Sequence, residues 1–195
     1  MSTPPQIAII ILAAGASTRL GAPKQLLRYK SQPLLRFICE IALQSKANSV
    51  YVVLGSQSAL IKEKVADMSL TVIENSNWLR GISTSIQTGI QALPETVDAA
   101  LMLSCDQPEV TPTLLDHIIE TYITNRIKVI ACRYGNTIGI PALYDRNIFP
   151  ELCALKGDHG AKSLILAHRD TMITVDFPLG VYDIDTQDDL TEYNQ

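Results

Sequence analysis

Residues 12–27, LAAGASTRLGAPKQLL, decide the fold, because the chain here leaves a hydrophobic run and enters a small, glycine-punctuated loop. The residues just before it, 6–12, are almost continuously apolar and predict a strand covered on both faces. Glycine permits a tight turn, and small side chains let the backbone approach a ligand closely. The stretch therefore predicts a buried strand that ends at a ligand-binding turn.

The rest of the chain repeats this alternation. Further strands are expected where β-branched and apolar residues cluster, at 49–54, 70–73, 98–104, 127–132 and 171–177. Helical spacing lies between them, in a helix from Pro33, in one over 113–123 that Thr111 caps, and in one that Asp158 caps. Alternating strands and helices predict an α/β fold, doubly wound, with a mostly parallel sheet and helices on both faces.

Length and composition agree with one folded unit. The chain has 195 residues, of which 47% are hydrophobic and 18% charged, so we expect a single domain over 1–195. The segment 133–160 has weaker periodicity and is a candidate insertion on the substrate side. The net charge is -4 and no Lys/Arg run stands out, which disfavours a nucleic-acid partner.

The spacing of the four cysteines, which includes no C-x-x-C pair, disfavours a zinc site or a disulfide framework. They are residues 39, 105, 132 and 153, and they suggest buried, reduced thiols. The first residues lack the basic region of a signal peptide, and no apolar stretch is long enough for a membrane span. We therefore expect a cytoplasmic protein with no membrane partner.

Two cations make the loop suitable for phosphates. Backbone N–H groups of the turn can hold phosphate oxygens, while Arg19 and Lys24 would neutralise their charge. The loop matches neither G-x-x-x-x-G-K-[ST] nor G-x-G-x-x-G, which disfavours a reductase that binds a dinucleotide. A strand-to-helix turn with solvated cations is the alternative interpretation.

One carboxylate is a candidate for a metal site. Asp106 follows the apolar run 98–104, where its side chain would lie beside the loop, and Mg²⁺ is typically held by one or two carboxylates plus substrate phosphates. Asp106 could equally start a turn before Pro108. Residues 183–190, DIDTQDDL, predict a helix start at which Thr186 is the cap.

The order of these motifs resembles the MobA-like nucleotidyltransferases, whose fold is similar to that of type A glycosyltransferases. Residues 12–26 match L-A-[AG]-G-x-[SG]-x-R-[ML]-G-x-x-K-x-L at every fixed position. Further matches are CDQP at 105–108, N-x-x-W-x-x-G-x-x-x-S at 75–85, and LKGDHGAK at 155–162. Within the superfamily, the sequence is most similar to the molybdenum cofactor cytidylyltransferases, although Ile140 stands where many of them have histidine.

The resemblance implies roles for particular residues. Arg19, Lys24 and Asp106 would be catalytic, and Asp106 and Asp185 would bind Mg²⁺, with Mn²⁺ as an alternative. The nucleotide-binding residues would be Leu12, Ala13, Ala14, Gly15, Arg19, Lys24, Gly81 and Ser85. Ser85 could instead cap a helix, and Trp78 is interpreted as packing rather than stacking on a base.

The implied reaction moves a nucleotidyl group from an NTP to an acceptor phosphate and releases pyrophosphate. An acceptor phosphate is already anionic, so the need is for neutralisation and positioning. A methyl group at residue 14 would crowd a purine, which favours CTP, and the implied acceptor is molybdenum cofactor on its way to a molybdoenzyme. The alternatives are a GTP-dependent guanylyltransferase, a sugar- or polyol-phosphate cytidylyltransferase, and a non-catalytic carrier of the cofactor.

Overall fold

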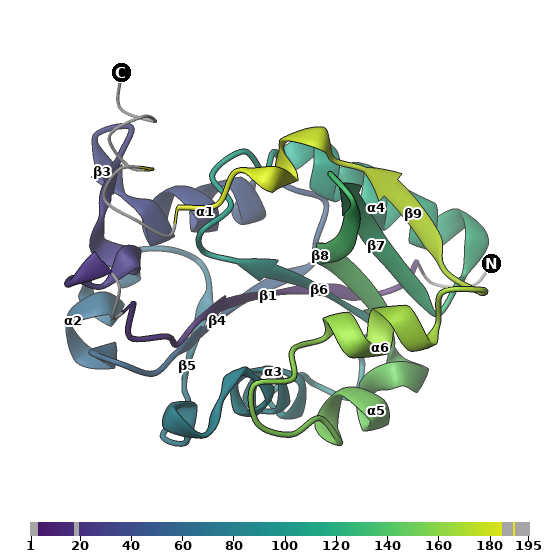
Figure 1. Cartoon of the computed structure of the whole chain (residues 1–195), viewed down its shortest axis with the longest axis horizontal. Helices are drawn as coiled ribbons and strands as arrows, with labels where there is room; N and C mark the ends of the chain where they lie inside the picture. Colours follow the sequence, from purple (N-terminus) through teal and green to yellow (C-terminus); the bar gives the residue numbers. More distant parts are fainter. Residues whose placement is uncertain (1–3, 18–19, 185–188, 190–195) are drawn as a thin grey trace.

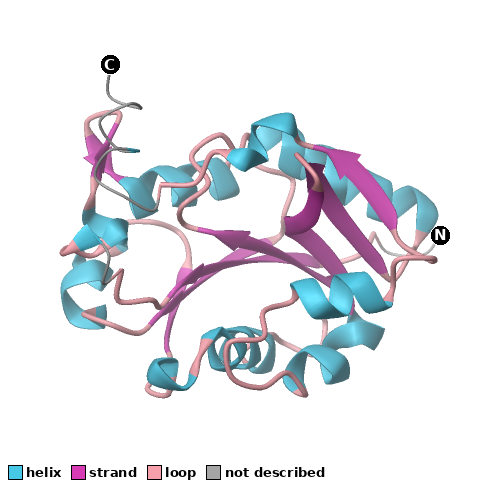
Figure 2. Ribbon diagram, in the orientation of Figure 1, coloured by secondary structure: helices cyan, strands magenta, loops and turns pink. Residues whose placement is uncertain are grey.

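A seven-stranded sheet forms the centre of the computed structural model, which describes residues 4–17, 20–184 and 189 (Figures 1 and 2). The strand order is β5-β4-β1-β6-β8-β7-β9. Strand β8 is antiparallel to β6 and β7, and every other neighbouring pair is parallel. The seven strands are β1 (Ile7–Ala13), β4 (Ser49–Leu54), β5 (Thr71–Glu74), β6 (Ala99–Ser104), β7 (Val129–Tyr134), β8 (Thr137–Asp145) and β9 (Ile173–Asp176). A small hairpin consists of β2 (Arg28–Tyr29) and β3 (Gln32–Pro33).

Helices cover both faces of this sheet, as the doubly wound prediction requires. Figure 1 shows α1 and α4 on one side and α3, α5 and α6 on the other. The helices are α1 (Leu34–Leu43), α2 (Ser58–Lys62), α3 (Ile82–Gln91), α4 (Pro112–Asn125), α5 (Phe149–Cys153) and α6 (Lys162–Ala167). Short 3-10 turns add η2 (Lys24–Leu26), η3 (Glu63–Val65), η4 (Trp78–Arg80), η5 (Arg146–Ile148) and η6 (Pro178–Val181).

The apolar run of β1 is continuous because successive side chains enter two different cores. Ile9 and Ile11 belong to the core under α1 and α4, whereas Ile10 and Leu12 belong to the core under α3, α5 and α6. Side chains of a strand alternate between the two faces of its sheet, so a strand covered on both faces needs apolar residues at every position. The whole of β1 is buried.

Two helix starts follow the prediction, and a third does not. Helix α1 follows Pro33, and α4 has Pro112 as its first residue, with the Thr111 side chain accepting a hydrogen bond from the Leu114 N–H. The expectation that Asp158 caps a helix is wrong. Helix α6 begins at Lys162, its cap residue is Ala161, and that cap makes no side-chain hydrogen bond.

The weakly periodic segment 133–160 contributes a strand to the sheet. Sequence patterning assigns no strand to residues 137–145, but these residues form β8, which lies between β6 and β7. The run TIGIPALYD hides this strand, because Gly139 and Pro141 interrupt its apolar pattern. A register shift in the pairing with β7, between Ala131 and Cys132, accommodates the irregularity.

The carboxyl ends of the first parallel strands meet at one edge of the sheet. Leu12 of β1 pairs with Val53 of β4 and with Ser104 of β6, so the loops that follow these strands emerge side by side. Ligands of open α/β sheets bind beyond this edge. Within residues 4–17, 20–184 and 189, no helix has both the length and the apolar character that a membrane span requires.

Candidate functional site

The loop after β1 is held in place by Gln25. The Gln25 side chain is only 1% exposed, and its Nε2 donates to the carbonyl oxygens of Ala13, at 2.7 Å, and Gly15, at 3.0 Å. Ser17, with a φ of 52°, turns the chain, and its Oγ accepts a hydrogen bond from the Lys24 N–H at 3.1 Å. These hydrogen bonds tie the turn to η2 and hold the backbone of Lys24, the first residue of η2, in place.

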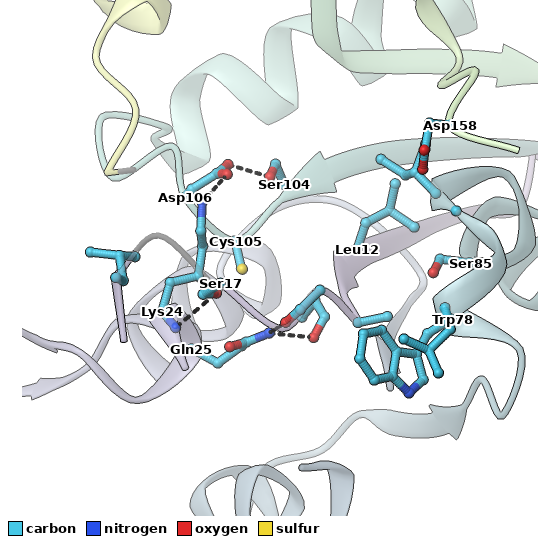
Figure 3. A pocket seen from close by; sticks show the side chains of 17 residues that line it. Leu12, Ser17, Lys24, Gln25, Trp78, Ser85, Ser104, Cys105, Asp106 and Asp158 are labelled. Carbon is cyan, nitrogen blue, oxygen red and sulfur yellow. Dashed lines mark hydrogen bonds and ion pairs between the residues drawn. The ribbon is translucent and has the colours of Figure 1, made fainter. Parts of the chain in front are cut away.

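Lys24 and Asp106 meet at one end of a pocket beyond the sheet edge (Figure 3). The Lys24 Nζ lies 2.8 Å from the Asp106 Oδ2, and the two side chains are 14% and 22% exposed. The Ser104 hydroxyl donates to the other oxygen of the same carboxylate. Residues 82 positions apart in the sequence thus form a charged pair that faces the pocket.

The other end of the pocket is built by η4 and α3. Gly81 precedes α3 with a φ of 102°, a backbone conformation that favours glycine. Ser85 lies inside the helix, whose cap residue is Gly81, so the capping alternative does not hold for it. Trp78 packs against the core under α3, α5 and α6, as the packing interpretation requires. It also lines the pocket.

Eight of the ten residues that the sequence singles out line this one cavity of about 460 Å³. They are Leu12, Ala13, Ala14, Gly15, Lys24, Gly81, Ser85 and Asp106. Arg19 and Asp185 lie outside the described residues. The Ile184 N–H donates to the Asp106 carbonyl oxygen at 2.9 Å, so the chain passes Asp106 one residue before Asp185.

The sequence missed several lining residues. Ser17, Gln25, Ser104 and Asp158 all face the cavity, although Asp158 had the signature of a helix cap and the others carried no distinctive signal. Apolar residues complete the wall, namely Leu20, Leu79 and Ile82.

Electrostatics argue against a thiolate nucleophile at this site. Cys105 lines the pocket, but burial, and then the charge of Asp106, raise the pKa of its thiol well above the usual range. The thiol therefore stays protonated near neutral pH, and thiolates rather than thiols are nucleophiles. Burial and the charge of Asp183 likewise raise the pKa of Tyr134, so its phenol is neutral.

The described residues offer one carboxylate to a metal ion at the phosphate end of this site, that of Asp106. Among residues 4–17, 20–184 and 189, no group of three or more His, Cys, Asp or Glu side chains could hold one. Asp106 offers one hard carboxylate at the pocket, and Mg²⁺ and Mn²⁺ bind well to a few carboxylates together with phosphate oxygens. The donor set suits a cation that enters together with a polyphosphate.

Comparison with known families identifies the domain. The model of the MobA-like NTP transferase domain matches residues 9–172, most of the chain. The chain belongs to this family. All the lining residues of the pocket lie within the matched range, and the pocket combines the loop, a strand-end carboxylate and a lysine.

Among curated proteins, this MobA-like transferase is 27% identical to the nicotine blue oxidoreductase of Paenarthrobacter nicotinovorans, over 81% of this chain and 80% of the relative. It is 26% identical to the bifunctional protein GlmU of Coxiella burnetii, over 84% of this chain. The chain spans only 34% of the length of that bifunctional protein.

Solved structures agree with the fold. Rv0371c of Mycobacterium tuberculosis H37Rv superposes with a TM-score of 0.83 at 28% identity, covering 97% of this chain and 99% of that one. A structure of Rv0371c in complex with manganese has a TM-score of 0.81 at 26% identity, covering 96% of this chain and 97% of that one. A nucleotidyl transferase of Methanothermobacter thermautotroptrophicus, at 20% identity and a TM-score of 0.81 over 96% and 95% of the two chains, shows the fold alone.

Proposed function

We propose that this MobA-like transferase moves a cytidylyl group from CTP to the phosphate of molybdenum cofactor and releases pyrophosphate. The observation that carries the proposal is the pair of Lys24 and Asp106, 2.8 Å apart at the end of a pocket that opens beside the loop after β1. Two anions must approach in line for this reaction, and a fixed cation and a carboxylate-bound metal would offset their repulsion.

The described residues would hold a divalent cation through the Asp106 carboxylate, with Asp185 proposed as a second ligand. Such a cation supplies Lewis-acid charge stabilisation to the phosphates. The complex of Rv0371c with manganese supports a divalent metal in this family. Lys24 would bind the phosphates that leave as pyrophosphate, with Arg19 proposed beside it, and the Ser104 hydroxyl would orient the Asp106 carboxylate.

The preference for CTP rests on the wall around the base. Ala14 lines the pocket and is buried, so its methyl group takes space that a purine would need. The acceptor is proposed from the motifs over 139–162, with Ile140 as the departure from the related cytidylyltransferases. A molybdoenzyme would then receive the product.

The deciding experiment measures pyrophosphate release with Mg²⁺, molybdenum cofactor and either CTP or GTP. We expect release with CTP and a loss of about a hundredfold or more in Asp106→Asn, which keeps the shape of the side chain but not its charge. Asp170→Asn, at an exposed position outside the pocket, is the matched control. Release with GTP alone would contradict the assigned base. Binding of the cofactor without release from any NTP would favour the carrier.

The similarity to the nicotine blue oxidoreductase favours one other candidate, a reductase that uses this pocket for a nicotinamide dinucleotide. The loop lacks the G-x-G-x-x-G pattern that such cofactors commonly require. Binding of NADH or NADPH, measured by fluorescence and competed by CTP, distinguishes the two. Tight dinucleotide binding with no pyrophosphate release would favour the reductase.

A further inference from the structure

The pocket has two chemically different ends, and the far end is where a base would lie. Lys24 and Asp106 mark the phosphate end, while Ser85, Trp78 and Asp158 lie at the opposite end, with Leu12 between them (Figure 3). A nucleoside triphosphate whose phosphates contact Lys24 would extend its base toward this far end. The inference below rests on the proposed function, because it assumes a bound nucleotide.

Asp158 is held at the far end by contacts between its loop and α3. The Gly157 carbonyl oxygen accepts a hydrogen bond from the Ser83 N–H at 3.1 Å, and the Gln87 Nε2 donates to the Leu155 carbonyl oxygen at 2.7 Å. A Cβ on Gly81 would lie 2.6 Å from the Asp158 Oδ1, so the carboxylate sits directly over the start of α3. Two hydrogen bonds therefore tie this loop to α3, and the exposed side chain of Asp158 lines the pocket.

Ser85 offers a hydrogen-bond donor at the same end of the pocket as Asp158. Asn75 is 3% exposed, and its Nδ2 donates to the Ser85 Oγ at 3.0 Å. The Asn77 N–H donates to the Asn75 Oδ1 at 2.9 Å, which fixes the orientation of that amide. A hydroxyl that already accepts from Asn75 has its own hydrogen available for an acceptor in the pocket.

We propose that Asp158 and Ser85 together select the base. The Asp158 carboxylate accepts a hydrogen bond from an exocyclic amine, and the Ser85 hydroxyl donates to the adjacent ring nitrogen. Cytosine presents this amine and nitrogen side by side, whereas uracil and guanine present a carbonyl oxygen and a ring N–H in their place. Adenine has the same pattern as cytosine, so the Ala14 wall is needed to reject it.

The test is equilibrium binding of CTP, UTP and GTP with Mg²⁺, measured by calorimetry in the absence of any acceptor. In the wild-type protein we expect CTP to bind at least about tenfold more tightly than UTP. In Asp158→Asn, whose amide can also donate to a carbonyl, this ratio should fall by about tenfold. Asp170→Asn should leave the ratio unchanged, and thermal melts of both variants verify that they fold.

The outcomes separate this proposal from the one it rests on. An unchanged ratio in Asp158→Asn, with CTP still bound, overturns base selection by Asp158 but leaves the transferase intact. An equal loss of affinity for CTP and UTP in Asp158→Asn overturns base selection as well, because the carboxylate would then bind the ribose that both nucleotides share. A wild-type protein that binds no nucleotide overturns both proposals.

Discussion

Gly81 illustrates how one missing side chain shapes the pocket. Its φ of 102° is strained for other residues, and a Cβ would meet the Gly157 carbonyl group at 2.4 Å. We expect Gly81→Ala to lower the free energy of unfolding by about 1–3 kcal/mol and to weaken CTP binding, because the loop that carries Asp158 must move away. Chemical denaturation and calorimetric titration of the same samples measure the two effects.

Gly160 provides the matched control for that substitution. It lies in the same loop region, but its nearest contact for an added Cβ is the Ile82 side chain at 3.7 Å, an ordinary van der Waals distance. Gly160→Ala should therefore change neither stability nor CTP binding appreciably. Equal effects of the two substitutions would mean that loss of glycine flexibility, rather than the contact with Gly157, sets the outcome.

Strand β8 and its neighbour α4 each contain a buried tyrosine, and only one of the two hydroxyl groups is hydrogen-bonded. The Tyr122 hydroxyl donates to the Asp145 carboxylate at 2.7 Å, joining α4 to the end of β8. The Tyr144 hydroxyl, in β8 itself, is buried and has no hydrogen-bond partner among the described residues. Removing a bonded hydroxyl leaves its partner unsatisfied, whereas removing an unbonded one relieves a desolvation cost.

We therefore expect Tyr122→Phe and Tyr144→Phe to shift stability in opposite directions. Tyr122→Phe should cost about 1–2 kcal/mol, and Tyr144→Phe should be neutral or stabilising by up to about 1 kcal/mol. Urea denaturation of the two variants beside the wild type decides this. Destabilisation by Tyr144→Phe would show that its hydroxyl is hydrogen-bonded in solution.

Elements that repeat a simple period could be predicted from the sequence, and those that depend on distant partners could not. Strands β1 and β4 are uninterrupted apolar runs, and α4 has a cap and a proline at its start, so local residues determine them. Strand β8 contains Gly139 and Pro141, and its place between β6 and β7 comes from pairing with residues far along the chain.

The same distinction holds for the pocket. The loop after β1 and Asp106 could be found, because a strand end, small residues and charges occur together in the sequence. Asp158 was misassigned, since its position depends on hydrogen bonds from Ser83 and Gln87 to the backbone of its loop. No local pattern reports such a contact between a loop and a helix more than sixty residues before it.

The core under α1 and α4 contains three buried thiols from separate parts of the fold. They are Cys39 in α1, Cys105 after β6 and Cys132 in β7. Burial raises the pKa of Cys39 and of Cys132 to about 12, and it also raises the pKa of Cys105. Unfolding exposes each thiol to water, where its pKa returns to the ordinary value of about 8.5.

Stability should consequently fall as the pH rises above about 8.5, because the unfolded chain then loses protons that the folded chain retains. Each thiol contributes up to about 1.4 kcal/mol per pH unit between its unfolded and folded pKa. Denaturant titrations at a series of pH values from neutral to about 10.5, under reducing conditions, measure the slope. The double variant Cys39→Ala/Cys132→Ala should start less stable, because of the cavities, but decline less steeply. Cys153→Ala is the control, since Cys153 is only partly buried and lies outside this core. Burial raises the pKa of its thiol as well, so this variant should flatten the decline less than the double variant does. An equal flattening would contradict the assignment to the two core thiols.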